Sequence, residues 1–462
     1  VEDLGEAGHR RHVGHGHAGL AERAGRAAGR EELDAERVES CAERRQTGLV
    51  EVAHLPAPRL DEGGPTVRRE GKRTPALAGE SPGPALASAA PLEGVKILDL
   101  FWVLAGPGAT RTLADYGATV VHVESVKHLD TLRAIPPYRF NNAHPKGAGG
   151  FQSVNANKLD LTLDIHEPEG RAIVMELVEW ADVVTESFAP GIAAHAGLDY
   201  ASLCEVKSDL IMISSCLMGQ TGPWRNFTGF GNLAAAVTGF QGHTGYPGAE
   251  PPGPYGAYTD FISARYNAIA ILAALEYRER TGEGQYIDQS QAEAALHFLG
   301  PAFLDYTVNG RLREQRGNAD DELQPHGIYP CDGVDRWIAI AVQTDAQWQA
   351  VTRVFGRPEW LDDDRFKTAE LRDLNIDARL RLIQAELMGA GTDEWIRRLD
   401  AEDVPSAPVL TRTDMIKHPQ IAATGILVQT EHPEAGPLRQ ARSAARFSVT
   451  TPEHHSGAPG LG

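Results

Sequence analysis

The chain has 462 residues, a formal charge of −19 and 42 % hydrophobic residues, a composition typical of a folded, acidic protein of roughly two to four structural units. The negative charge disfavours polyanionic partners, so we expect no binding to nucleic acid or to an anionic membrane surface. The sequence shows no apolar run that could span a membrane, no signal-peptide core and no CxxC pair among its four cysteines, so we expect a cytoplasmic protein without a metal site.

Residues 1–90 differ in amino-acid composition from the rest of the chain. We expect them to form an atypical extension that ends in a flexible Pro/Gly/Ala-rich linker. Positions 47–83 echo positions 424–460 at a constant offset, with several identical residues. Such an echo is typical of repeated units. It predicts that 47–83 is the tail of an upstream copy in a tandem protein.

Between residues 91 and 300, short apolar runs alternate with helical patterns. This order predicts a doubly wound, Rossmann-like α/β domain with a parallel sheet. The expected strands are 95–100, 119–124, 182–187 and 210–215, and the expected helices are 109–116, 168–180 and 260–280. A Gly-Pro-Gly turn is expected before the first helix, and Gly282 is expected to end the last one.

A different pattern follows residue 300 and predicts a smaller α+β domain over 301–410. Its expected strands are 326–330 and 337–342, and its expected helices are 346–355 and 374–387. From the pattern alone, the apolar segment 426–430 fits either domain.

Few chemical motifs stand out. The turn AGPGAT (105–110) lacks the third glycine of a dinucleotide-binding loop, and the chain holds no GxxxxGK[ST], HExxH or GxSxG motif. We therefore expect no nicotinamide, flavin or metal cofactor. Asp260 begins a long helix, where unpaired backbone N–H groups stabilise a carboxylate, and by residue type alone it is an ordinary helix cap.

Six segments, in this order, resemble the family III coenzyme A transferases, which include formyl-CoA transferase, carnitine CoA-transferase and the related α-methylacyl-CoA racemase. They are PLEGVKILDLFWVLAGPGATRTLADYGATVVHVES (91–125), NKLDLTLDIHEPEGR (157–171), ADVVTESFAPG (181–191), GQTGPW (219–224), YTDFISARYNAIAILAALEYRERTGEGQ (258–285) and HGIYPC (326–331). The resemblance implies that Asp260 is a catalytic nucleophile and that the substrates are a CoA thioester and a carboxylic acid.

The implied activity is that of a CoA-transferase, an enzyme that transfers a sulfur-containing group. A carboxylate shielded from water attacks the donor thioester and forms a mixed anhydride, which CoA thiolate converts to an aspartyl-CoA thioester. The acceptor acid then reverses these steps. We expect oxyanion stabilisation by backbone amides near the glycine-rich turns.

Two alternatives stay open. An acyl-CoA racemase or epimerase would pair the aspartate with a histidine, but Phe230 stands at that histidine's position and Gly231 at that of its acidic neighbour. The other alternative is a non-catalytic half of a tandem CoA-transferase, which would not bind CoA.

The resemblance also implies a set of CoA-binding residues, namely Leu104, Ala105, Leu163, His166, Ser187, Phe188 and Phe230. On the polar side the chain departs from the family, because Ser125, His166, Ser187 and His195 replace more strongly binding side chains. Lys127, Arg133, Arg139 and Lys158 are candidate ligands for the CoA phosphates in their place.

Members of this family form interlocked homodimers, and the resemblance implies the same assembly here. It also implies that residues 411–462 return to the large domain, so that the small one is an insertion.

Overall fold

The computed structural model of the protein describes residues 90–432, 436–450, 452 and 454–462. The predictions made for residues 1–89, including the echo at 47–83, lie outside the described residues.

A six-stranded parallel sheet forms the larger part of the structure, with strand order β3-β2-β1-β4-β5-β6. Its strands are β1 (Lys96–Leu100), β2 (Thr119–Glu124), β3 (Leu159–Thr162), β4 (Val183–Glu186), β5 (Ile211–Cys216) and β6 (Tyr286–Ser290). The strand order reverses between β1 and β4, and the predicted doubly wound α/β architecture is confirmed.

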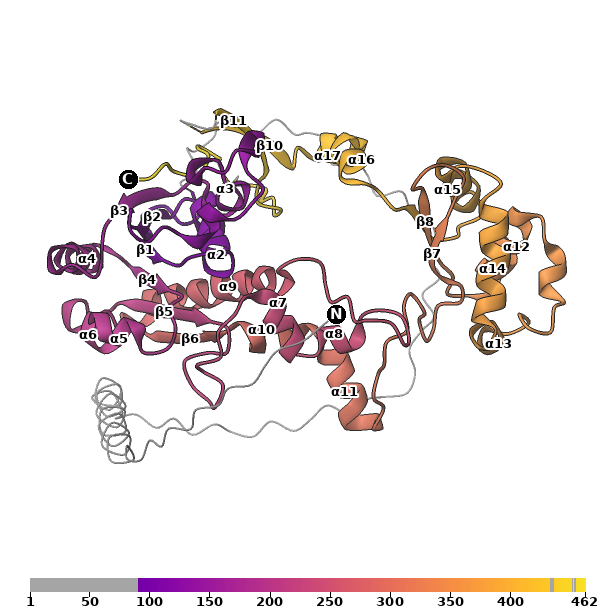
Figure 1. Ribbon diagram of the computed structural model, residues 1–462, viewed down its shortest axis with the longest axis horizontal. Coiled ribbons are helices and arrows are strands. Elements are labelled where there is room, and N and C mark those ends of the chain that lie inside the picture. The colour runs from indigo at the N-terminus through magenta and orange to yellow at the C-terminus, as the bar shows by residue number, and fades with distance from the viewer. Residues whose placement is uncertain (1–89, 433–435, 451, 453) are drawn as a thin grey trace, which may run out of the picture.

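Helices cover both faces of this sheet (Figure 1). On one face lie α2 (Ala105–Asp115) and α9 (Tyr258–Thr281), which pack around Ile97. On the other lie α4 (Pro168–Trp180), α5 (Ile192–Ala196) and α6 (Tyr200–Val206), which pack around Leu98. Neighbouring residues of β1 thus serve opposite cores, as strand alternation requires.

Some boundaries differ from the sequence-based expectations. The predicted turn at 106–108 is wrong, because α2 already begins at Ala105. Pro107 fits the first helical turn, where its missing N–H is not needed, and a side chain at Gly106 would overlap Phe101. At the other end of the helical layer, α9 stops as predicted at Gly282, which has φ +76°.

Further helices lie after β2 and around the end of β6. They are α3 (Gly149–Asn155), α7 (Gly231–Val237), α8 (Phe240–His243), α10 (Gln291–Phe298) and α11 (Gly300–Asn309). In the part of the chain that the structure describes, no helix is both long and apolar enough to cross a bilayer.

A smaller α+β unit stands apart from the six-stranded sheet (Figure 1). Its antiparallel sheet consists of β7 (His326–Pro330), β8 (Trp337–Ala341) and β9 (Ser406–Pro408). Its helices are α12 (Asp345–Phe355), α13 (Ala369–Leu374), α14 (Ile376–Leu387) and α15 (Thr392–Asp400). Its core combines buried aliphatic residues with aromatic ones, among them Trp348, Trp360 and Trp395.

After β9 the chain returns to the large sheet by way of α16 (Arg412–Lys417) and α17 (Pro419–Thr424). The hairpin β10 (Leu427–His432) and β11 (Gly436–Ala441) then packs beside α2. Contacts with the large unit include Arg111 to the Ala441 carbonyl at 2.6 Å and Tyr116 Oη to Ser443 Oγ at 2.9 Å.

Candidate functional site

The candidate site lies where the strand order of the parallel sheet reverses. In such sheets, ligands bind outside the carboxyl ends of the strands at the reversal point. The segments that follow β1 and β4 carry Trp102 and Ser187, and the Trp102 backbone N–H donates to Ser187 Oγ at 3.0 Å. The sheet topology therefore joins two segments that the sequence separates by about 85 residues.

Backbone strain occurs at the same place. Val103 has φ +71°, a conformation that is unfavourable for a β-branched residue. The buried carboxylate of Asp130 accepts a hydrogen bond from the Val103 N–H at 3.1 Å and another from the Leu132 N–H at 2.8 Å. These bonds fix the strained loop against the loop that follows β2.

Asp260 lies in the first turn of α9 and lines a cleft of about 270 Å³ at this reversal point. The side chain is only 5 % exposed, and its Oδ2 atom is buried. Because the residue nevertheless lines the cleft, we infer that its other oxygen, Oδ1, faces it. Other residues around the cleft include Trp102, Ala105, Ser187, Phe188, Phe230 and Gln291.

The inner side of the Asp260 carboxylate packs against the start of α7 and α10. A Cβ at Gly231 would overlap Oδ2, so only glycine fits there. Burial raises the pKa of Asp260 to about 6, while the Gln291 side chain and the Gly231 N–H lower it in part. At neutral pH the group is thus mainly an ionised, poorly solvated carboxylate.

A narrow slot of about 180 Å³ extends from this cleft along the ends of β1, β2 and β3. It is lined largely by apolar residues, including Leu163, and by His166 and His128 at its polar side. Trp102 and Phe188 line both the slot and the cleft, which makes the two parts of one groove.

Seven of the eight residues singled out from the sequence line this groove. Leu163, His166 and Phe188 line the slot, and Ala105, Ser187, Phe188, Phe230 and Asp260 line the cleft. Leu104 lines neither part, because it packs against the cluster around Leu132 and Phe151.

Two of the proposed phosphate ligands are wrong. Lys158 is buried and pairs with Asp99 at 2.9 Å, and Arg133 is buried beside Glu124, where its Nε donates to a carboxylate oxygen at 2.6 Å. Lys127 is 60 % exposed near the slot and contacts Asp164 and Glu167, each at 3.0 Å.

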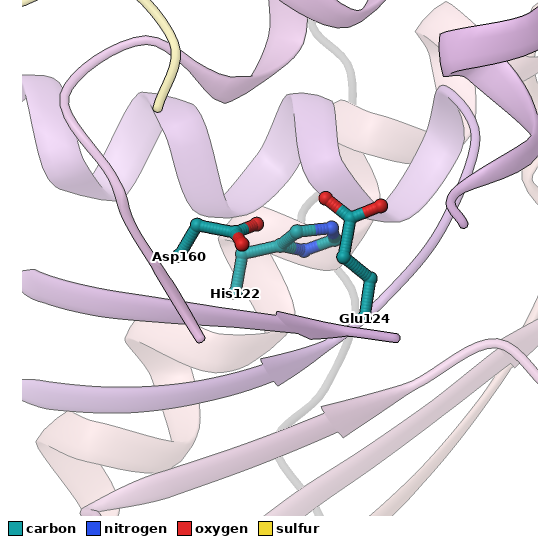
Figure 2. A group of neighbouring side chains, drawn as sticks. All are labelled: His122, Glu124 and Asp160. Atoms are coloured by element: carbon teal, nitrogen blue, oxygen red, sulfur yellow. The ribbon is translucent and has the colours of Figure 1, made fainter. Parts of the chain in front are cut away.

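The same buried network contains a group with metal-ligand spacing. Figure 2 shows the His122 ring between the carboxylates of Glu124 and Asp160, and their ligand atoms lie within 4.8 Å of one another. However, the Arg133 guanidinium already contacts both carboxylates and stacks 3.6 Å from the centre of the Phe151 ring. Although burial opposes the effect, Arg133 lowers the pKa of Glu124. We therefore interpret the group as an ion-pair network that anchors the loop after β2.

The groove residues that the sequence analysis did not single out include three with polar or charged side chains, His128, Arg225 and Gln291. Arg225 is the one basic residue among the described residues that line the Asp260 cleft. Its position after the GQTGPW segment was a usable signal. The sequence contains no such signal for Gln291, because this residue reaches the site only through the packing of α10 against α9.

Comparison with known proteins gives consistent matches. A family model described as "CoA-transferase family III" matches residues 92–462. The chain is 32 % identical to a succinyl-CoA–D-citramalate CoA-transferase from Chloroflexus aurantiacus, over 78 % of this chain and 88 % of that protein. It is 31 % identical to a succinate–glutarate CoA-transferase from Agrobacterium fabrum, over 80 % of this chain and 93 % of that protein.

A solved structure agrees with these matches. A CaiB/BaiF family protein from Brucella suis superimposes with a TM-score of 0.75 at 31 % identity, covering 81 % of this chain and 97 % of that one.

Proposed function

Because the chain belongs to the family III CoA-transferases, we propose that it moves CoA from an acyl-CoA donor to a free carboxylic acid with Asp260 as the nucleophile. The observation that carries this proposal is the Asp260 carboxylate itself. It is ionised at neutral pH, poorly solvated, and presented by one oxygen to a cleft that continues into an apolar slot. A carboxylate in such surroundings is an effective nucleophile because little water must be removed from it.

The reaction begins when Asp260 Oδ1 attacks the thioester carbonyl carbon. The C–S bond breaks, and CoA thiolate leaves an acyl-aspartyl anhydride. The thiolate then attacks Asp260 Cγ, the Cγ–Oδ1 bond breaks, and the donor acid departs from an aspartyl-CoA thioester. The acceptor carboxylate attacks Cγ and expels thiolate, which finally attacks the acceptor acyl carbon and releases both acyl-CoA and the Asp260 carboxylate.

For CoA we propose the groove described above, with its adenine end in the slot beside Leu163 and His166 and its pantetheine arm along Phe188. The slot is mainly apolar, which suits a flat heterocycle, and the shared Trp102 and Phe188 connect it to Asp260.

We propose a dicarboxylic acid as the acceptor. Both relatives compared above carry names that specify dicarboxylic substrates. Arg225 lines the cleft and would bind the second carboxylate of such an acid. A guanidinium binds a carboxylate with two parallel hydrogen bonds. We expect Arg225→Gln to raise the KM for succinate or glutarate about tenfold and to leave that for butyrate unchanged. Equal effects on both kinds of acid in steady-state assays would contradict the assignment.

The epimerase alternative is weaker. A two-base mechanism needs a second proton carrier beside Asp260, and among the described residues the cleft lining contains no histidine.

Intact-protein mass spectrometry after brief incubation with a panel of acyl-CoAs tests the proposal. We expect a CoA adduct on the wild-type protein, loss of the adduct in Asp260→Ala, and its retention in Asp115→Asn. Asp115 is a matched control because burial also raises its pKa to about 6, but it lies on α2 outside the cleft. Absence of any adduct from protein that binds CoA would refute the nucleophile role, and failure to bind CoA would favour a non-catalytic half.

We further propose that the active form is the interlocked homodimer implied by the family. A cavity of about 1000 Å³ lies between α2, α9 and the β10–β11 hairpin. Unpartnered apolar side chains lie nearby on α9, including Phe261, Ile269 and Leu272. A second chain in this region would cover them.

A further inference from the structure

Hydrogen bonds among Thr259, Gly231 and Gln291 lie along the inner side of the Asp260 carboxylate, and the reaction proposed above assigns them no role. The Thr259 hydroxyl donates to the Gly231 carbonyl at 2.8 Å and accepts from Gln291 Nε2 at 3.1 Å. Thr259 is fully buried, and Gln291 is 6 % exposed. With both its donor and its acceptor site engaged, the hydroxyl fixes the position of the Gln291 amide.

A side-chain amide nitrogen carries two hydrogens, and Thr259 engages one of them. The Gln291 side chain also interacts with the Asp260 carboxylate, as does the Gly231 N–H, and both lower the pKa that burial raises. Donors from α10 and α7 thus converge on one carboxylate from α9.

Oδ2 nevertheless has no hydrogen-bond partner among the described residues, although it is buried. An unpaired buried oxygen is unfavourable in the resting protein. Donors that are close to an atom but not yet well aligned are typical of catalytic contacts that tighten only as the reaction proceeds.

The reaction places negative charge on this very atom. When CoA thiolate attacks Cγ of the anhydride, the sulfur–carbon bond forms and the π pair of the Cγ=Oδ2 bond moves to Oδ2. The tetrahedral oxyanion collapses when the Cγ–Oδ1 bond breaks and the donor acid leaves. The first attack, by Oδ1 on the thioester, places its oxyanion on the donor instead.

We propose that Gln291 is a catalytic residue, whose side-chain amide, anchored by Thr259, forms with the Gly231 N–H an oxyanion hole for Oδ2 of Asp260. This assignment rests on the proposed nucleophile role of Asp260. It predicts that Gln291 accelerates the conversion of anhydride to aspartyl-CoA more than the formation of the anhydride.

The test compares Gln291→Met, which keeps the length of the side chain but removes the amide, with Gln289→Met two residues earlier. Gln289 lies outside the groove. Removing one oxyanion donor lowers kcat by about 100-fold, and we expect this for Gln291→Met, with the KM for acyl-CoA within about threefold of wild type. Quenched-flow intact-mass measurements should show the acyl adduct rising at the expense of the CoA adduct.

A second pair of variants probes the anchor. Thr259→Val should shift the adduct ratio in the same direction as Gln291→Met, and Thr259→Ser, which keeps the hydroxyl, should restore it. This pair decides the question if Gln291→Met does not fold.

The proposal is overturned if Gln291→Met matches Gln289→Met in kcat and adduct ratio, or if it lowers both adducts equally, as loss of packing would. Failure of the underlying function looks different. In that case wild type forms no CoA adduct, or Asp260→Ala keeps its turnover.

Discussion

Asp260 destabilises the folded protein at neutral pH. Burial raises its pKa from an ordinary 3.8 to about 6, so the folded state binds the proton more tightly than the unfolded state does. The destabilisation is absent below the unfolded pKa, develops as the pH rises through about 6, and is complete above it.

Asp260→Asn removes this charge. We expect the variant to be more stable than wild type by about 2–3 kcal/mol at pH 7.5, with the gain shrinking as the pH falls toward 4.5. Urea unfolding at several pH values measures it. A gain that does not vary with pH would show that the buried charge is not its cause.

Gly231 is the other residue on which the site depends directly. In Gly231→Ala the new Cβ would overlap Oδ2 of Asp260 and crowd Thr259 Oγ1, so the carboxylate must move. Misplacement by about 1 Å can lower a rate about 100-fold, and we expect such a loss of kcat.

CoA affinity should stay within about threefold of wild type in Gly231→Ala, because the slot does not include Gly231. Gly242→Ala on α8 is the matched control, since a Cβ there meets no atom within 4 Å. Kinetics and CoA titration on both variants provide the check, and normal turnover of Gly231→Ala would contradict the packing argument.

At the scale of the elements, the buried carboxylate of Asp99 in β1 connects α2, β4 and the segment that leads into β3. It accepts hydrogen bonds from Thr110 of α2 and Thr185 of β4, each at 2.8 Å, and from Lys158, which directly precedes β3, at 2.9 Å. Burial opposes ionisation, but Lys158 lowers the pKa of Asp99 below its ordinary value. The ion pair therefore orders the sheet directly beneath the groove.

Lys158→Met leaves Asp99 as an uncompensated buried charge. We expect a loss of about 3–5 kcal/mol in the free energy of unfolding, and a partial recovery in the double variant Asp99→Asn/Lys158→Met. Denaturant unfolding of both proteins tests this. A single variant as stable as wild type would mean that the pair contributes nothing.

Prediction from the sequence succeeded for elements with a clear period and clear ends. The helix at 168–180 and the strand at 326–330 were expected at the bounds they have in the structure. The strands β3 and β6 were missed, because these edge strands carry polar residues such as Asp160 and Asp288. An edge strand gains its order from pairing along the sheet, which its own residues do not reveal.

The site follows the same logic. Asp260 was singled out through the resemblance, since by its position alone it was an ordinary helix cap. Phe188 was expected among the CoA-binding residues because it matches an aromatic residue of the family's motif, whereas Gln291 depends on a contact between two helices that begin 33 residues apart. Such a contact is a property of packing and has no local signal.

At the scale of the whole molecule, the large cavity beside α9 is the feature on which the proposed dimer depends. Several arginines line it, namely Arg111, Arg139, Arg265, Arg439 and Arg442. Four of these five, all but Arg111, have no carboxylate partner among the described residues. The chain as a whole is strongly acidic, so an acidic segment of a second copy, as in the proposed dimer, would complement this cavity in charge.

We therefore expect a dimer by light scattering and by native mass spectrometry. Interlocked chains separate only by partial unfolding, so mixing with an isotopically labelled copy should yield little exchange over hours without denaturant. A monomer at micromolar concentration, or rapid subunit exchange, would contradict the interlocked assembly.

Two separate stretches of chain connect the small unit to the large one. One comprises residues 310–325 between α11 and β7, and the other leaves β9 and carries α16 and α17. Lateral contacts hold the second stretch on both sides, because Asp414 pairs with Arg336 at 3.0 Å and Arg412 donates to Tyr255 Oη at 3.4 Å. Two connections restrict twisting of the small unit relative to the large one more than they restrict bending. We therefore expect any relative motion of the two units to be mainly a bending about this double connection.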